Sequence, residues 1–330
     1  MKASKVLSLK RLWLVTTLLL TLSLPSLTSC KSTTTAQSTD LVATTQLVPQ
    51  AEYPELPPLR PGAIYSPRLE NVRRIALEDE ANDAIPAGSY QKVTALLTSD
   101  NVFYQTDPNG NDVACIPMIA AMIDRDATYK STDEMQRIFD KAYQDGLAFT
   151  PKLFEIALAN HLYLDGLENA VKAASHIVDK ANRRAKSKGS ELTQEEIAAD
   201  LNDLVRYSAI IDKEHYVDAT LALISALESN GYEVIEIDNR FLGKDGHEDL
   251  TLPYRAIHLG VKDGNRIIEI QVHDHSSQAI RESTHEIYEH MRQLDKQSDE
   301  YRRLDQQRLD AWSTYQNPIG IERIQSRFPQ

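Results

Sequence analysis

The sequence predicts an α+β fold in which a mixed β-sheet packs with helices and is preceded by a mostly helical region. Three observations predict it. Strand and helix patterns alternate from residue 206 onward, residues 254–274 show the two-residue alternation of a β-hairpin, and residues 66–150 contain several helix-start signals. The order strand, helix, strand, strand, helix is typical of a sheet covered by helices.

The C-terminal part of the chain, residues 151–330, supplies the predicted sheet. The short apolar run RYSAII predicts a strand at 206–211. An amphipathic helix is expected at 215–231, because its apolar residues have helical spacing and it ends on a glycine. The remaining segments are a strand at 232–238, the hairpin at 254–274, and a long charged helical region at 276–311 that ends before Trp312 and Tyr315, which we expect to dock the tail.

The hairpin has one apolar face and one polar face. With Asp263-Gly264 as a two-residue turn, the expected cross-strand pairs are Lys262 with Asn265, His258 with Glu269, Ala256 with Gln271, and Tyr254 with His273. The opposite face carries Ile257, Leu259, Val261, Ile268, Ile270 and Val272. Tyrosine, histidine, glutamate and glutamine donate or accept hydrogen bonds to ligands, and the first three also titrate, so the polar face is predicted to be a binding site. The alternative is an ordinary solvated outer face.

Helix signals precede the sheet. Ser131 and Glu134 have capping-box spacing and predict a helix that stops near Gly146, and Thr150-Pro151 predicts the start of the next one. A further helix is expected at 168–185. On it Lys172, His176 and Lys180 recur every four residues and therefore share one stripe.

The N-terminus has the features of a bacterial lipoprotein signal. Residues 1–29 combine four cations with an apolar run too short to span a membrane comfortably, and Leu27-Thr28-Ser29-Cys30 resembles a lipobox. We therefore expect lipidation at Cys30, a Ser-, Thr- and Pro-rich tether at 30–65, and attachment to the cell envelope, on the periplasmic face of the outer membrane. An ordinary signal peptide with an incidental cysteine is the alternative.

Net charge and cysteine content argue against two properties, binding of duplex nucleic acid and an intramolecular disulfide. The formal net charge of −12 argues against wrapping duplex nucleic acid. Once Cys30 is acylated, Cys115 is the one cysteine left, so no intramolecular disulfide is expected. Cys115 is expected to be a small core residue, because the nearby sequence supplies no base to activate it. The sequence does not indicate an oligomeric state.

Four motifs, in order along about residues 165–295, resemble the synthetase domain of the RelA/SpoT family, whose members make the alarmones (p)ppGpp. They are Lys172 with His176-Ile177 and Lys180, then Asp203-Leu204-Val205-Arg206-Tyr207-Ser208, then Tyr254-Arg255-Ala256-Ile257-His258-Leu259 with Glu269-Ile270-Gln271, and last Arg281-Glu282-Ser283-Thr284-His285. The match looks closer still to divergent members fused to phage head proteins and bacterial toxins.

The resemblance implies a nucleotidyltransferase-like fold and transfer of a pyrophosphoryl group from ATP to the 3′-hydroxyl of a guanine nucleotide. It implies that Asp203 and Glu269 hold Mg²⁺ and act catalytically, with Glu269 also assisting deprotonation of the hydroxyl. It implies that the nucleotide-binding residues are Lys172, His176, Lys180, Arg206, Tyr254, His258, Gln271, His273 and His285, with Tyr254 stacking on the acceptor guanine.

Several positions depart from the family pattern. His176 stands where the family has serine, Ser208 where it has arginine, and His273-Asp274 where it has Arg-Thr. These changes remove fixed charges that would meet a triphosphate. A catalytically inactive ligand- or protein-binding module at the envelope is therefore the alternative to an enzyme. A weaker alternative is a zinc site at His273-Asp274-His275, which lacks a specified third ligand.

Overall fold

The computed structural model describes residues 56–126, 133–173, 177, 180, 201, 203–243, 245–264 and 266–329. The chain divides into two units, Met1–Ala51 and Glu52–Gln330. The first unit lies outside the described residues, and with it the expected signal peptide and Cys30, so lipidation stays a prediction. Within the described part of the chain, no helix combines the length and apolar character needed to cross a membrane.

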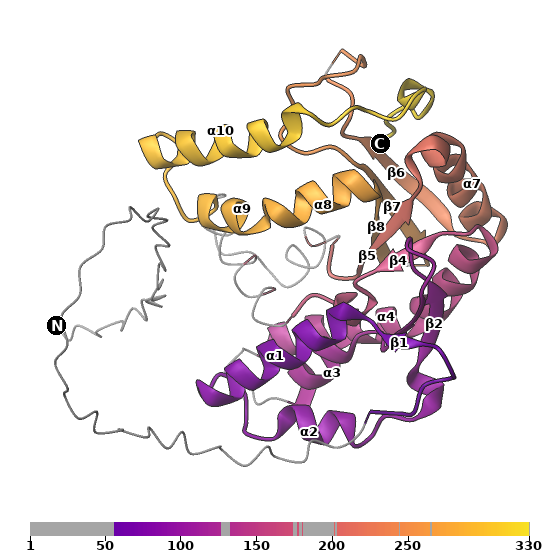
Figure 1. The fold of residues 1–330 in the computed structure, drawn as a ribbon, viewed down its shortest axis with the longest axis vertical. Helices are drawn as coiled ribbons and strands as arrows, with labels where there is room; N and C mark the ends of the chain where they lie inside the picture. Colours follow the sequence, from indigo (N-terminus) through magenta and orange to yellow (C-terminus); the bar gives the residue numbers. More distant parts are fainter. Residues whose placement is uncertain are drawn as a thin grey trace, which may run out of the picture. The chain divides into compact units, whose positions relative to one another are not determined.

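A five-stranded mixed sheet forms the centre of the second unit (Figure 1). Its strands, in spatial order, are β4 (Tyr163–Asp165), β5 (Arg206–Ile211), β8 (Arg266–Asp274), β7 (Ile257–Asp263) and β6 (Glu233–Asn239). β5 and β8 are parallel, and every other neighbouring pair is antiparallel. The predicted α+β fold with a mixed sheet is confirmed.

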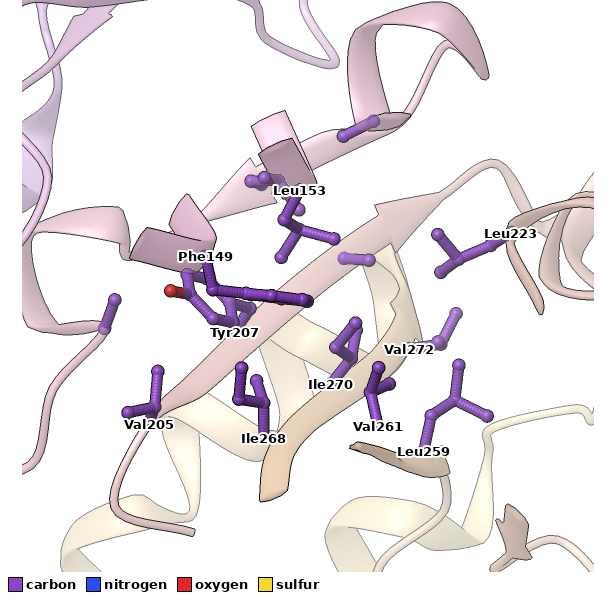
Figure 2. Close-up of a cluster of buried hydrophobic side chains, with 14 of the residues drawn as sticks. Phe149, Leu153, Val205, Tyr207, Leu223, Leu259, Val261, Ile268, Ile270 and Val272 are labelled. Atoms are coloured by element: carbon purple, nitrogen blue, oxygen red, sulfur yellow. The ribbon is translucent and has the colours of Figure 1, made fainter. Parts of the chain in front are cut away.

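One face of this sheet packs against two helices, α4 (Asp133–Ala159) and α7 (Tyr216–Ser229). The core residues alternate along each strand, as the hairpin pattern predicts. Figure 2 shows side chains from α4, α7 and three strands meeting there, labelled Phe149, Leu153, Val205, Tyr207, Leu223, Leu259, Val261, Ile268, Ile270 and Val272. Apolar side chains fill this face, so it leaves no space for a ligand.

α4 is one continuous helix, and the predicted break between Gly146 and Thr150-Pro151 is wrong. Thr150 is not an N-cap. Its hydroxyl lies 2.7 Å from the Gly146 carbonyl oxygen and 2.8 Å from the Tyr207 hydroxyl, which anchors the helix to the sheet. Tertiary packing of both halves against the sheet outweighs the local stop and start signals. α4 therefore runs across the boundary expected at residues 150 and 151.

The region before α4 contains a small sheet that the sequence analysis did not predict. The strands β1 (Ile64–Tyr65), β2 (Phe103–Thr106) and β3 (Asp112–Cys115) are ordered β1-β3-β2. They lie among the helices α1 (Pro67–Ala81), α2 (Ser89–Thr94) and α3 (Ile119–Asp126). Strands this short show too few alternations to be detected from sequence. Cys115 is 1% exposed, which confirms it as a core residue.

The charged region predicted as one long helix consists of three helices. They are α8 (His275–Ser283), α9 (His285–Met291) and α10 (Asp299–Ser313). Ser298 starts α10 by accepting a hydrogen bond from the Tyr301 N–H. Trp312 and Tyr315 are buried, which confirms that they dock the tail. The structure also contains the short 3₁₀ helices Ser99–Asn101, Leu167–Asn169, Lys213–His215 and Ile321–Arg323.

The helix expected at 168–185 does not begin at Glu168. Glu168 belongs to a 3₁₀ turn, and Val171 forms an isolated bridge with Val205. Backbone pairing with the segment before β5 therefore replaces the first helical turn. Most of the remaining span, His176 included, lies outside the described residues.

Candidate functional site

The polar face of the hairpin exists, but the register differs from the predicted one. Asp263 pairs with Arg266, so the turn lies one residue further along the chain, and Gly264 has φ +60°. The predicted pairs of His258 with Glu269, Ala256 with Gln271 and Tyr254 with His273 are therefore wrong. The observed pairs are His258 with Gln271 and Gly260 with Glu269. Sliding the pairing by two residues keeps each side chain on its predicted face.

The register extends this polar face across the whole sheet. Two transverse rows result, which are Asp165, Ser208, Gln271, His258 and Asp238 in one, and Arg206, Glu269, Gly260 and Glu236 in the other. α8 flanks this face, since Gln278 Nε2 lies 2.7 Å from Asp165 Oδ2. In Figure 1, α7 and α8 lie on opposite sides of the strands. We call this face, which extends from α8 to β6, the polar sheet face.

Tyr254 lies three residues before β7 and contacts two histidines of the polar sheet face. Its hydroxyl is 2.9 Å from His258 Nε2 and 3.3 Å from His273 Nε2. Burial, reinforced by nearby arginine charges, lowers the pKa of both histidines well below the usual value. Burial also raises the pKa of Tyr254 to about 12. All three groups are therefore neutral at pH 7, and a fixed set of hydrogen bonds orients the phenol.

The ring of Tyr254 faces cationic and aromatic neighbours. Arg240 Cζ lies 5.7 Å from the ring centroid, and Trp312 makes an edge contact with a centroid distance of 6.0 Å. A planar base that stacks on Tyr254 would therefore also meet the Arg240 guanidinium. Arg240 and a flat ring form favourable cation–π contacts.

The charges of three arginines reach Tyr254, and two of these residues, Arg240 and Arg281, were missed as site residues by the sequence analysis. Arg206, Arg240 and Arg281 each lower the pKa of Tyr254 through their charge, in opposition to burial. Arg240 follows the last residue of β6, and its Nε donates to Asp238 Oδ2 at 2.6 Å. Arg281 comes from α8, and burial lowers its pKa. Position at a strand end was the one available signal for Arg240. Arg281 belongs to the last of the four motifs that resemble the RelA/SpoT family, but it was not predicted to have a role in the site.

Two predicted phosphate-binding lysines bind one predicted catalytic acid. Lys172 Nζ lies 3.3 Å from Asp203 Oδ2, and Lys180 Nζ lies 2.5 Å from Asp203 Oδ1. All three side chains are at most 20% exposed. Burial alone would raise the pKa of Asp203, but the two lysine charges and Arg206 lower it to about 2. The triple is thus a largely buried ion cluster with both carboxylate oxygens occupied.

This ion cluster makes stability depend on pH. Because the pKa of Asp203 is lower in the folded state than the usual 3.8, its stabilisation is present above pH 4 and lost as pH falls towards 2. We expect Asp203→Asn to lower the free energy of unfolding by about 2 kcal/mol at pH 6. Urea denaturation at pH 6 and pH 3 measures it. The gap between wild type and variant should shrink at pH 3, and an unchanged gap would contradict the assignment.

Asp203 and Glu269 lie at the same end of the parallel strands β5 and β8. Asp203 precedes β5, whose first residue Arg206 pairs with Glu269, and the Glu269 N–H donates to the Val205 carbonyl oxygen at 3.0 Å. Glu269 accepts a hydrogen bond from Gln271 Nε2 and lies 3.5 Å from His258 Nδ1. The two predicted metal ligands thus belong to one end of the sheet, but their carboxylates have different partners.

Glu236 adds a further carboxylate that the sequence analysis did not select. It pairs across β6 and β7 with Gly260, which on its other side pairs with Glu269. Burial raises the pKa of Glu236, and the charges of Asp238 and Glu269 raise it further. Its alternation with Asp238 along β6 was a signal that both face the same side as the hairpin histidine.

The remaining predicted site residues fall outside this cluster. His285 is exposed on α9, and partial burial, reinforced by the charges of Arg281 and Arg206, lowers its pKa. Of the zinc alternative, Asp274 caps α8 by accepting from the Ser277 N–H and binds the Tyr315 hydroxyl, and His275 lies 3.2 Å from Asp212. Among the described residues, no three His, Cys, Asp or Glu side chains have the geometry of a metal site.

Comparisons with known proteins give partial structural matches. No protein-family model matches the chain, and no curated protein matches it. A structure of the type VI effector Tas1 with its immunity protein matches with 15% identity and a TM-score of 0.37, covering 56% of this chain and 97% of that one. Small alarmone synthetase 1 from Bacillus subtilis, bound to its product pppGpp, matches with 17% identity and a TM-score of 0.38, covering 55% and 92%.

A GTP pyrophosphokinase family protein from Streptococcus pneumoniae matches with 17% identity and a TM-score of 0.35, covering 55% of this chain and 89% of that one. These are the kinds of protein that the four sequence motifs resemble.

Proposed function

We propose that the polar sheet face binds a nucleoside polyphosphate, with the base at Tyr254 and the phosphates at Lys172 and Lys180. The ion cluster of Lys172, Asp203 and Lys180 is the observation that carries the proposal. Two lysines on a single carboxylate form a preassembled cluster with net positive charge just before β5. Polyphosphate supplies the several anionic oxygens that such a cluster binds.

Ligand binding would exchange the partners within this cluster. When phosphate oxygens meet the two ammonium groups, Asp203 loses its counter-ions and needs another cation. A divalent cation that accompanies the polyphosphate supplies that charge. Asp203 then has a cation as its partner, and the two lysines have the phosphates. A buried carboxylate left without any partner would cost several kcal/mol, which couples phosphate binding to metal binding.

The residues present suit Mg²⁺ on the basis of their chemistry. Mg²⁺ binds carboxylate and amide oxygens and is commonly held by one or two carboxylates together with substrate phosphates. Asp203 and Glu269 supply such oxygens, although Asp203 does so only after its lysines move to the phosphates. When bound, the metal neutralises charge on the transferring phosphoryl group.

Two histidines and Arg240 complete the surroundings of the Tyr254 ring, where the base is proposed to bind. The neutral histidines at positions 258 and 273 hold the Tyr254 hydroxyl, leaving the ring to stack. Arg240 lies over that ring and binds Asp238, so it has a fixed orientation. A purine that stacks on the Tyr254 ring would have the Arg240 guanidinium beside it, and both groups bind bases through their faces.

The presence of Glu269 favours catalysis as a second step after binding. Its side chain is 21% exposed, so the carboxylate reaches the open part of the face. In pyrophosphoryl transfer, a hydroxyl oxygen of the acceptor nucleotide attacks the β-phosphorus of ATP, the bond from that phosphorus to the α–β bridging oxygen breaks, and AMP leaves. Glu269 accepts the hydroxyl proton.

Calorimetric titration of the purified chain with ATP, and separately with GDP, in the presence of Mg²⁺ tests the binding step. We expect measurable binding of at least one nucleotide, and roughly 10- to 100-fold weaker binding for Lys172→Ala and Lys180→Ala, because each loses charge-assisted bonds to phosphate. Lys141→Ala is the matched control, since Lys141 is an exposed helix lysine paired with Asp145. Absence of binding, or equal losses in all three variants, would contradict the proposal.

Incubation with ATP, GDP and Mg²⁺, followed by chromatography, tests the transfer step. Production of AMP together with a guanosine polyphosphate supports transfer, and Glu269→Gln should abolish it while nucleotide binding persists. Nucleotide binding without AMP from the wild type would overturn the transfer step and support the binding module.

A further inference from the structure

Two glutamates on the polar sheet face lie on either side of a glycine. Gly260 of β7 pairs with Glu236 on one neighbouring strand and with Glu269 on the other. Residues paired in this way point to the same side of the sheet. The two carboxylates therefore project to the same side, and the single position between them has no side chain.

The missing side chain of Gly260 leaves the space that Glu236 occupies. A Cβ at Gly260 would lie 2.9 Å from Glu236 Cβ and 3.3 Å from Glu236 Oε2. The Glu236 side chain thus leans over Gly260, in the direction of the strand that carries Glu269. Within the described part of the chain, Glu236 forms no ion pair. Its neighbour Asp238, by contrast, is paired with Arg240.

A buried oxygen without a partner lies beside this pair. Gln271 is 5% exposed, and its Nε2 donates to Glu269. Its Oε1 is buried and has no hydrogen-bond partner among the described residues. Both atoms belong to one amide group, so the unpartnered oxygen lies next to the Glu269 carboxylate. A buried amide oxygen of this kind is costly unless a donor or cation meets it.

We propose that Glu236, Glu269 and the Gln271 side-chain oxygen bind one divalent cation across Gly260. The three ligands are hard oxygen donors, which suit Mg²⁺, Mn²⁺ or Ca²⁺ rather than zinc. A cation there offsets the repulsion between the two glutamate charges. It also gives the buried amide oxygen a partner. Asp203 is not a ligand of this site, because its oxygens are held by Lys172 and Lys180.

The inference goes beyond the proposed nucleotide site, with which it shares Glu269. It requires no nucleotide. It also replaces Asp203 with Glu236 as the carboxylate that works with Glu269 in the unliganded protein. A test with metal alone therefore separates its failure from a failure of nucleotide binding.

The experiment titrates the full chain with Mn²⁺ and follows free Mn²⁺ by electron paramagnetic resonance, without nucleotide. One bound Mn²⁺ per chain is expected, displaced by excess Mg²⁺. Glu236→Gln should weaken binding at least 10-fold. Glu233→Gln, on the same strand but 69% exposed and beside Lys262, is the matched control and should bind as wild type does.

Asp203→Asn distinguishes the two possible metal sites, and Gly260→Ala tests the space between the glutamates. Asp203→Asn should keep its Mn²⁺ affinity. Gly260→Ala retains every proposed ligand and should weaken binding, because its methyl group displaces Glu236. Circular dichroism tests whether each variant is folded. If Glu236→Gln is unfolded, Gly260→Ala alone tests the site. Loss of Mn²⁺ in Asp203→Asn with retention in both Glu236→Gln and Gly260→Ala overturns the proposal, as does absence of binding by wild type.

Discussion

Replacing Arg255 with alanine is expected to lower the free energy of unfolding by about 3 kcal/mol or more. Arg255 is 1% exposed. Its guanidinium donates to the carbonyl oxygens of Leu250 at 2.6 Å, Tyr315 at 3.0 Å and Trp312 at 3.2 Å. These bonds join the loop before β7 to the end of α10. Truncation leaves the carbonyls buried and unpaired and opens a cavity beneath the Trp312 ring.

Urea denaturation followed by Trp312 fluorescence measures this loss. Arg323→Ala is the control, because Arg323 is 55% exposed and pairs with the exposed Asp218, so its removal should cost well under 1 kcal/mol. A cost at Arg255 no larger than that at Arg323 would show that the tail is held without the buried guanidinium. Because Trp312 also contacts Tyr254, a detached tail should also disturb the ring on which the base is proposed to stack.

Replacing Gly146 with valine is expected to cost about 2 kcal/mol or more, although glycine is a poor helix former. Helix propensity alone would make most substitutions of a helix glycine favourable by about 1 kcal/mol. At Gly146, however, an added Cβ would lie 2.6 Å from Met118 Sδ and 2.8 Å from Val171 Cγ2. The side chain must displace two packed neighbours, and Val171 belongs to the bridge that precedes Lys172.

Thermal unfolding of Gly146→Val, with Gln144→Val as the control, measures this effect. Gln144 is exposed on the same helix, so its variant reports the cost of a β-branched residue in α4 without crowding. Equal melting temperatures for the two variants would show that Met118 and Val171 move aside freely. A specific loss at Gly146 supports close packing between α4 and the segment that positions Lys172.

The polar sheet face shows how far prediction from sequence extends. Alternation along the hairpin predicted which residues face the core and which face away, and every strand expected from residue 206 onward is present. The pairing partners were wrong, because Gly264 and not Asp263 begins the turn. Register depends on how the turn closes and how both strands pack, and neither is visible along a single strand. The predicted register was wrong by two residues, so each side chain still lies on the face that was predicted for it.

The helices show the opposite balance between local signals and packing. Thr150-Pro151 is a strong local start signal, yet α4 continues through it because the Thr150 hydroxyl meets Gly146 and Tyr207. The sequence predicted Lys172 and Lys180 on one helical stripe, but Lys172 is not helical in the structure. The sequence did not indicate that both would bind Asp203, more than twenty residues away from Lys180. Local signals compete with tertiary contacts of comparable energy, so they decide helix boundaries only where such contacts are weak.

The sequence by itself determined the fold class, the order of the sheet segments and the two faces of the hairpin, because these follow from repeating patterns of side-chain polarity along the chain. Only the tertiary structure decided the register that places Gly260 between Glu236 and Glu269, the contact of Arg240 with the Tyr254 ring, and the pairing of Asp203 with two lysines. These arrangements join residues from different strands, helices and loops. Their geometry comes from packing among distant segments, which periodicity along one segment does not encode.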